Sequence, residues 1–304
     1  TLAMNGTGRQ SINEVNNNSK YIFLFRLQRD SINTSDTITL NAGLYLGNHA
    51  GGGLRLNQGA ATNTILDIED FAFLALWRGA ASTPTANGRI TSSSGGGSIL
   101  INRSDAGSSA LGQFNFVPGS SFNTLNMNCY APFETDSMML NGNIFVTDNL
   151  FLNGGRLVCM NGTVIETPAS CNVDPGSVFS FIDGKLRRAL TTGGDFPVGN
   201  GNVFAPVHID PTGAANDYSV QYFKSGYGNY TIDPATLGSY PGYEVSKKEY
   251  WTIDRVAGLS ANIIFYYTSD SSGILTPGQV KVAHFDGTDW NDLGGAADPG
   301  NTTT

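Results

Sequence analysis

The acidic residues are the first place to look for chemistry in this sequence. Glu69 and Asp70 form the only adjacent acidic pair in the first part of the chain, and Asp67 would share a face with Glu69 in a strand. Glycoside hydrolases of the inverting type need two carboxylates about 6.5–9.5 Å apart, and parallel β-helices can supply such a pair from neighbouring coils. A solvated acidic edge explains the three residues as well, and we expect no catalysis from them.

Other catalytic patterns are missing from the sequence. The three histidines, His49, His208 and His284, are far apart in the chain, and no GxSxG or HExxH string occurs. The GGG strings at 51–53 and 95–97 lack the Lys-Ser/Thr that follows the glycines of a phosphate-binding loop. The sequence therefore predicts a protein that is not an enzyme and needs no organic cofactor.

A calcium site is the one metal centre that the spacing of acidic residues suggests. Asp286, Asp289 and Asp292 recur every three residues around Trp290, and carboxylate oxygens on a Gly-containing loop suit a hard cation. The spacing is not that of an EF-hand. An Asp-Gly hairpin turn beside a packed Trp is the interpretation that we favour.

Three cysteines, Cys129, Cys159 and Cys171, make an odd number without CxxC spacing. This pattern supports neither a zinc site nor a disulfide framework. We predict buried free thiols, because a free Cys behaves as a small apolar residue, and a single bridge between two of them is the alternative.

Tyrosines form the best candidate surface for recognition. Of the 12 Tyr residues, seven lie between 218 and 250. Those at alternating strand positions, such as Tyr218 and Tyr222, should be core residues. Four others are in Gly/Pro-rich loop sequence, where exposed rings could stack on sugars or anchor a partner protein: Tyr227, Tyr230, Tyr240 and Tyr243. The alternative, which we favour, is that these rings pack the loop onto its own domain.

The first part of the chain, residues 1–175, consists of short apolar-alternating strings between Asn-Gly and Gly-Gly turns. Period-two alternation predicts strands, and the turns need the positive φ that Gly and Asn tolerate. Asn-Gly turns are also typical of hairpins, so a meander competes with a solenoid. A recurrence of roughly 20–25 residues favours the solenoid, specifically a right-handed parallel β-helix. Residues 65–81 could form a short helix, but we favour a strand or a capping insertion.

Beyond Asp174-Pro175-Gly176 the composition of the sequence and the length of its strand-like strings change. Tyr and Pro become commoner, and the strand-like strings lengthen, as in YEVSKKEYWTIDRV and ANIIFYYTSD. Regular strands separated by turn residues indicate an antiparallel β-sandwich, Ig-like or jelly-roll-like. We therefore predict an all-β protein with a solenoid stalk over residues 1–175 and a sandwich domain over residues 176–304.

Composition narrows the range of functions. With 38 Gly and 14% charged residues, the sequence is unlike a helical bundle, and a net charge of −8 disfavours binding to nucleic acid or to an anionic membrane. The lysines are unevenly distributed along the chain, because Lys20 is the only lysine before Lys185. No apolar run approaches the length of a membrane span. We expect a soluble chain whose export signal is removed or lies upstream.

Several strings together resemble a module of large secreted surface proteins of the Bacteroidota, exported by the type IX secretion system. In that family a Gly-rich β-helical stretch precedes a β-sandwich with an F-P-V-G signature, a later P-V and a later Y-W-x-I. The matching residues here are Phe196, Pro197, Val198, Gly199, Phe204, Pro206, Val207, Tyr250, Trp251 and Ile253. The likeness is good over about 139–295 and loose over 1–138.

The resemblance implies a secreted, extracellular protein of the cell surface, since members of this family are mostly adhesins, filament or surface-layer components. Three strings also resemble the Asp-Ser/Thr-apolar acceptor of O-glycosylation in Bacteroidota, with candidate acceptors Ser31, Thr37 and Ser137. The partners implied are further copies of the chain, other surface proteins or glycans.

We therefore predict a secreted structural or adhesive protein of the cell surface that assembles into a filament or surface layer or that acts in adhesion. The alternative is a β-helix protein that binds or degrades polysaccharide. Convergent carboxylates in a groove would favour that alternative, whereas a flat or apolar end would favour assembly.

Overall fold

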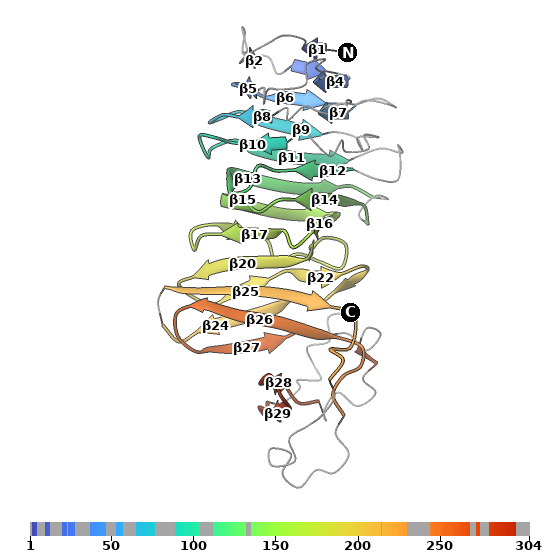
Figure 1. The fold of residues 1–304 in the computed structure, drawn as a ribbon, viewed down its shortest axis with the longest axis vertical. Helices are drawn as coiled ribbons and strands as arrows, with labels where there is room; N and C mark the ends of the chain where they lie inside the picture. The colour runs from blue at the N-terminus through green and yellow to red at the C-terminus, as the bar shows by residue number, and fades with distance from the viewer. Residues whose placement is uncertain are drawn as a thin grey trace.

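The protein is nearly all β-structure and is built as an elongated stack of short strands (Figure 1). The computed structural model describes residues 2–4, 10–12, 20–22, 24–27, 37–46, 53–56, 65–76, 89–103, 112–131, 135–213, 215–229, 244–267, 272–273 and 280–295. The N-terminal strands lie at one end of the stack, and the C-terminal strands lie at the other.

Parallel pairing between successive coils builds the upper part of the stack as a β-solenoid, as the sequence predicts. One sheet contains β2 (Gln10–Ile12), β5 (Thr37–Leu40), β8 (Ile65–Ile68) and β10 (Arg89–Thr91). A second contains β1 (Leu2–Met4), β4 (Leu24–Leu27) and β7 (Gly53–Leu56). A third contains β12 (Gln113–Asn115), β14 (Ser137–Asn141), β16 (Arg156–Met160), β19 (Ile182–Asp183), β22 (Val198–Asn200) and β23 (Val203–Phe204).

The largest sheet has 11 strands and runs along most of the molecule. Its parallel part contains β3 (Lys20–Ile22), β6 (Leu44–Leu46), β9 (Phe73–Leu76), β11 (Ser98–Arg103), β13 (Ser120–Cys129), β15 (Ile144–Gly154), β17 (Val164–Thr167), β18 (Asn172–Val173) and β20 (Lys185–Leu190). β25 (Asn216–Phe223) and β26 (Tyr250–Ala257) then extend it antiparallel.

A register-aligned column of apolar side chains forms the centre of the solenoid. Leu44, Leu74, Ile99, Leu125 and Leu150 pair in sequence across five neighbouring strands, and each is at most 1% exposed. Each buried side chain of this size contributes roughly 1.5–3 kcal/mol to folding. Because each member pairs with one in the coil above and one in the coil below, no coil can bury its apolar face alone.

Turns between coils follow the Asn-Gly signals in the sequence. Gly142, Asn161 and Gly162 have φ values of 102°, 52° and 76°, in the left-handed region that the turn requires. These turns join strands that pair in parallel with the next coil, so the solenoid interpretation is confirmed over the hairpin meander. Residues 65–76 form strands β8 and β9, and residues 77–81 lie outside the described residues.

Asparagine side chains add a polar ladder along the third sheet. The amide of Asn141 donates to Asn115 Oδ1 at 2.9 Å, and the amide of Asn161 donates to Asn141 Oδ1 at 3.1 Å. Because each amide is both a donor and an acceptor, equivalent positions of successive coils can bond to one another. These hydrogen bonds help to fix the register that the apolar column needs.

The pairing changes from parallel to antiparallel at β20. This strand pairs in parallel with β17 on one side and antiparallel with β25 on the other. A second antiparallel sheet contains β21 (Gly194–Phe196), β24 (Val207–Pro211) and β27 (Ala261–Phe265). β28 (Ala283–Phe285) and β29 (Trp290–Asp292) form a separate hairpin. The predicted sandwich and the predicted division at residue 175 stay predictions.

One hydrophobic core connects the solenoid coils to the antiparallel strands. It extends from Ile38 to Tyr222 and includes Phe196, Val207 and Val220. Arg188 also points inward from β20 and is 9% exposed. Its guanidinium lies 5.7 Å from the centre of the Phe196 ring, and burial lowers its pKa. The core is therefore continuous across the change of strand direction.

Two adjacent methionines allow a test of which side chains of a solenoid strand point into the core and which point to solvent. Met138 is 1% exposed and Met139 is 39% exposed, both in β14. We expect Met138→Ala to lower the free energy of unfolding by about 2–5 kcal/mol through the lost contacts and the cavity left behind. Met139→Ala should change it by about 0.5 kcal/mol or less. Denaturant titration followed by circular dichroism measures both, and equal losses would contradict the assignment.

Candidate functional sites

The acidic segment at the end of β8 is held by hydrogen bonds to Ser93, which follows β10. Asp67 is 2% exposed, and its carboxylate accepts hydrogen bonds from Ser93 N at 2.8 Å and from Ser93 Oγ at 2.6 Å. The same hydroxyl lies 3.4 Å from Glu69 Oε1. Asp70 is exposed beside Gly96, and Phe71 follows with a φ of 63° and 97% exposure. The structure thus brings Asp67 and Glu69 together on Ser93, with Asp67 acting as a structural acceptor.

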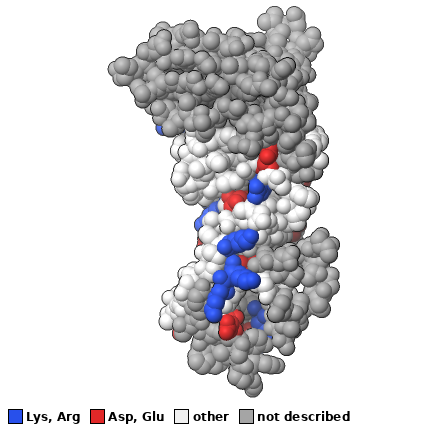
Figure 2. All heavy atoms as spheres, turned by 90° about the vertical axis from the view of Figure 1, so that its right-hand side faces the viewer, with Lys and Arg blue, Asp and Glu red and all other residues white. Residues whose placement is uncertain are grey.

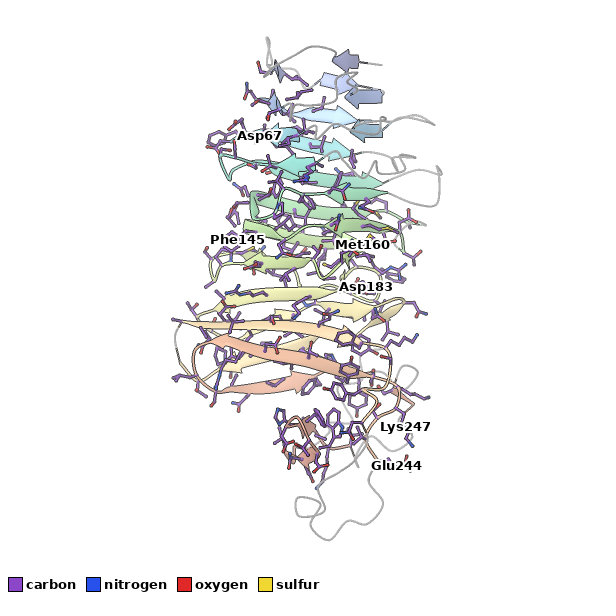
Figure 3. The ribbon with its side chains drawn as sticks, viewed as in Figure 1. Asp67, Phe145, Met160, Asp183, Glu244 and Lys247 are labelled. Atoms are coloured by element: carbon purple, nitrogen blue, oxygen red, sulfur yellow. The ribbon has the colours of Figure 1, made fainter. Side chains whose placement is uncertain are left out.

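A second carboxylate with a comparable role is Asp183 in the third sheet. Its two oxygens accept hydrogen bonds from the amide of Asn200 at 2.9 Å and from Gly201 N at 2.7 Å. Figure 3 shows Asp67 and Asp183 at different levels and on opposite sides of the stack. Asp67 and Asp183 therefore do not form a pair.

Of the three histidines, His208 has a carboxylate partner. Its Nδ1 lies 2.6 Å from Asp195 Oδ1, across the antiparallel pair of β21 and β24. His284 is exposed in β28, and His49 lies outside the described residues. The sequence does not reveal the Asp195–His208 pair, because the two residues are 13 positions apart and only the strand pairing brings them together.

Two of the three aspartates proposed for calcium, Asp286 and Asp292, have other partners in the structure. Asp286 Oδ1 accepts from Thr288 N at 2.8 Å and from Asp289 N at 3.0 Å, and these hydrogen bonds lower the pKa of Asp286. Asp292 Oδ2 lies 2.9 Å from Lys281 Nζ. Within the described ranges no group of three or more His, Cys, Asp or Glu side chains is arranged to hold a metal ion. Calcium binding by Asp286, Asp289 and Asp292 stays a prediction.

The tyrosines divide into core and loop residues. Tyr218 and Tyr222 are 3% and 1% exposed, and Tyr222 donates to buried Glu249 at 2.8 Å. Trp251 contacts Tyr222 and donates from Nε1 to Ala205 O at 3.0 Å, so it packs as a core aromatic. Tyr230, Tyr240 and Tyr243 lie outside the described residues.

Tyr227 joins an aromatic cluster that attaches the β28–β29 hairpin to the body of the protein. Its ring centre lies 5.2 Å from that of Tyr250, 4.8 Å from that of Phe285 and 5.7 Å from that of Trp290. Trp290 Nε1 also donates to Asn229 O at 2.7 Å. The ring is still 43% exposed. Tyr227 thus packs its loop onto the hairpin, and its role in recognition stays a prediction.

The three cysteines are free thiols in the structure. Burial raises the pKa of Cys159 to about 12 and that of Cys171 to about 11. A thiol with so high a pKa is a poor nucleophile near neutral pH. Of the glycosylation candidates, Thr37 begins β5 and Ser137 begins β14, both half-buried, whereas Ser31 lies outside the described residues.

The C-terminal end of the stack exposes apolar side chains on its last two strands. Among the described residues, β26 ends the 11-stranded sheet and β27 ends the sheet of β21, β24 and β27. Val256 is 49% exposed, Leu259 58%, Ile263 37% and Ile264 49%. The two strands differ in charge: β26 carries Asp254 and Arg255, whereas Gly258 to Tyr267 contains no charged residue. β27 is thus an apolar and uncharged sheet edge.

Basic side chains gather on one side of the lower half of the molecule. Figure 2 shows Lys and Arg side chains in a column there, with scattered acidic residues beside them. Arg156 donates to Gly201 O, and Lys224 Nζ donates to Asn202 Oδ1 at 2.8 Å, so these two cations hold the turn at 201–202. Lys247 lies 3.2 Å from Glu244 Oε2 near the lower end (Figure 3). These three basic side chains therefore have partners within the chain.

Comparison of this chain with protein-family models, with curated proteins and with solved structures finds no match. The resemblance to secreted surface proteins of the Bacteroidota therefore stays a prediction. In the part of the chain that the structure describes, no helix is long and apolar enough to cross a membrane.

The role of Asp67 can be tested by substitution. We expect Asp67→Ala to lower the free energy of unfolding by roughly 1.5–3 kcal/mol, because it removes two charge-assisted hydrogen bonds and leaves the backbone N–H of Ser93 without its acceptor. Glu69→Ala, which removes a more exposed carboxylate, should have an effect of at most about 0.5 kcal/mol. Thermal unfolding checks both variants. Full stability of Asp67→Ala would contradict the structural role.

The aromatic cluster makes a separate prediction for Trp290, which is 9% exposed. Tyr227→Ala should uncover this indole and shift the tryptophan emission to longer wavelength. Tyr130→Ala, which removes a 53% exposed ring elsewhere, is the control and should leave the spectrum unchanged. An unchanged spectrum for Tyr227→Ala would show that Tyr227 does not cover the hairpin.

Proposed function

We propose that this chain is a secreted, non-enzymatic structural protein of the cell surface, in which the β-solenoid forms a rigid stalk and the C-terminal strands join a second copy. The observation that carries the proposal is the uncharged, exposed edge of β27 at the end of one continuous core. We further propose that the sheet of β25 and β26 packs against the sheet of β21, β24 and β27 as a sandwich. The rings of Trp251 in β26 and Phe265 in β27, whose centres are 5.1 Å apart, support this packing.

A sheet edge is a template for another strand, because its outward N–H and C=O groups are available for pairing. Proteins that must stay monomeric usually protect such an edge with charge, Pro or a bulge. Asp254 and Arg255 provide charge at the β26 edge, whereas the stretch ANIIFYY in and after β27 has no charge and no Pro. Apolar strands of this composition favour association between identical segments.

A second copy is the partner that best fits this edge. In an antiparallel pair of two β27 strands, no register places like charges opposite each other, because the segment Gly258 to Tyr267 has none. Closed pairs with two-fold symmetry are the commonest assemblies of identical chains. The resulting dimer joins two stalks at their C-terminal ends.

Sedimentation velocity tests the self-association. The chain should sediment as a concentration-dependent dimer of twice 32.2 kDa, and Ile264→Lys should return it to a 32.2 kDa monomer by placing a charge in the interface. Val178→Lys makes the same change at a residue that is 53% exposed away from this end, and it should remain dimeric.

The proposal is wrong if the chain is monomeric at all concentrations, if Ile264→Lys still forms dimers, or if Val178→Lys dissociates them equally. Circular dichroism of each variant confirms that the fold is intact before sedimentation is compared.

A further inference from the structure

The pair of Asp195 and His208 has the geometry of a metal-binding histidine with its supporting carboxylate. Asp195 lies directly opposite His208 in the ladder of β21 and β24, and Oδ1 is 2.6 Å from Nδ1. A carboxylate only accepts hydrogen bonds, so Nδ1 carries the proton and donates it. In the neutral ring the lone pair is then on Nε2.

The free Nε2 lies close to the backbone of Gly193, which only the absence of a side chain at that position allows. A Cβ built at Gly193 would lie 2.8 Å from His208 Nε2 and 3.3 Å from Asp210 Oδ1. His208 and Asp210 are two positions apart in β24 and therefore share a face of the sheet. An imidazole nitrogen and a carboxylate oxygen thus both lie beside the backbone of Gly193.

The surroundings of Gly193 are polar and open to water. The side chain of His208 is 29% exposed and that of Asp195 is 42% exposed, while Asp210 is exposed. Asn262 of β27 lies opposite Asp210 and is also exposed. Among the described residues, the carboxylate of Asp210 has no hydrogen-bond partner, so it is available to a ligand.

We propose that His208 Nε2 and Asp210 Oδ1 bind a divalent first-row transition metal ion such as Zn²⁺ over Gly193, with Asp195 orienting the imidazole. Imidazole nitrogen and carboxylate oxygen are ordinary ligands of zinc, at distances of about 2.0–2.2 Å. Histidines that bind metals almost always donate their other N–H to a carboxylate or carbonyl.

With two protein ligands, the ion keeps open positions for water or for an outside ligand, and the amide of Asn262 is on the same face. Ca²⁺ and Mg²⁺ prefer all-oxygen ligand sets, so they should bind here more weakly than Zn²⁺. The site is independent of the aspartates at 286, 289 and 292.

Isothermal titration of the intact chain with ZnCl₂ tests the proposal. We expect one saturable site per chain, which is lost in His208→Ala and weakened about 10–100-fold in Asp195→Asn, the size of effect typical of a supporting carboxylate. His284→Ala removes another exposed histidine and should bind Zn²⁺ as the unchanged chain does.

Gly193→Ala is the sharpest variant, because its methyl group would crowd His208 Nε2 and Asp210 Oδ1 while both ligands stay in the chain. Gly193 does not have a left-handed φ, so Ala is compatible with its backbone. We expect it to keep its circular dichroism spectrum and lose Zn²⁺ binding. NMR of the histidine Cε1 protons in the unchanged chain gives a second readout: the His208 signal should shift to saturation, and the His284 signal should not.

The proposal is overturned if Zn²⁺ does not bind, if binding survives His208→Ala or a folded Gly193→Ala, or if the His208 signal does not respond. None of these outcomes depends on self-association through β27.

Discussion

Aligned stacking of apolar side chains between coils is the constraint on which the rest of this structure depends. Leu74 is covered by Leu44 and Ile99, and Ile99 in turn by Leu74 and Leu125. Because each coil covers its neighbours, the stack is stable only while the register holds, and the asparagine ladder and the Gly turns serve that register. The same constraint leaves a problem at the ends, where the last strands have no further coil to cover them.

Features with a short sequence period could be predicted from the sequence, whereas contacts between distant residues could not. The Asn-Gly turns and the inward positions of the strands follow from local spacing, so the solenoid was predictable. The antiparallel pairing expected beyond residue 175 begins only on the far side of β20, which still pairs in parallel with β17. Local spacing does not place this change, because Lys185–Leu190 alternates like the strands before it. The pair of Asp195 and His208 depends on the register between β21 and β24, which no local pattern specifies.

Several polar side chains of the described part of the chain stabilise the fold. Asp67 and Asp183 hold turns, and Arg188 lies in the core over Phe196. Tyr227 packs the β28–β29 hairpin while keeping part of its ring at the surface. Two exposed features, the edge of β27 and the polar surface beside Gly193, both belong to the sheet of β21, β24 and β27. This sheet is therefore where we place the contacts of the protein with other molecules.

Electron microscopy of the purified, intact chain tests most directly the central claim that the stack is a rigid stalk that pairs through its C-terminal edge. The account predicts two-fold symmetric particles in which two straight rods meet at the ends that contain β27. Single rods, or rods that touch along their sides or at their N-terminal ends, would contradict it.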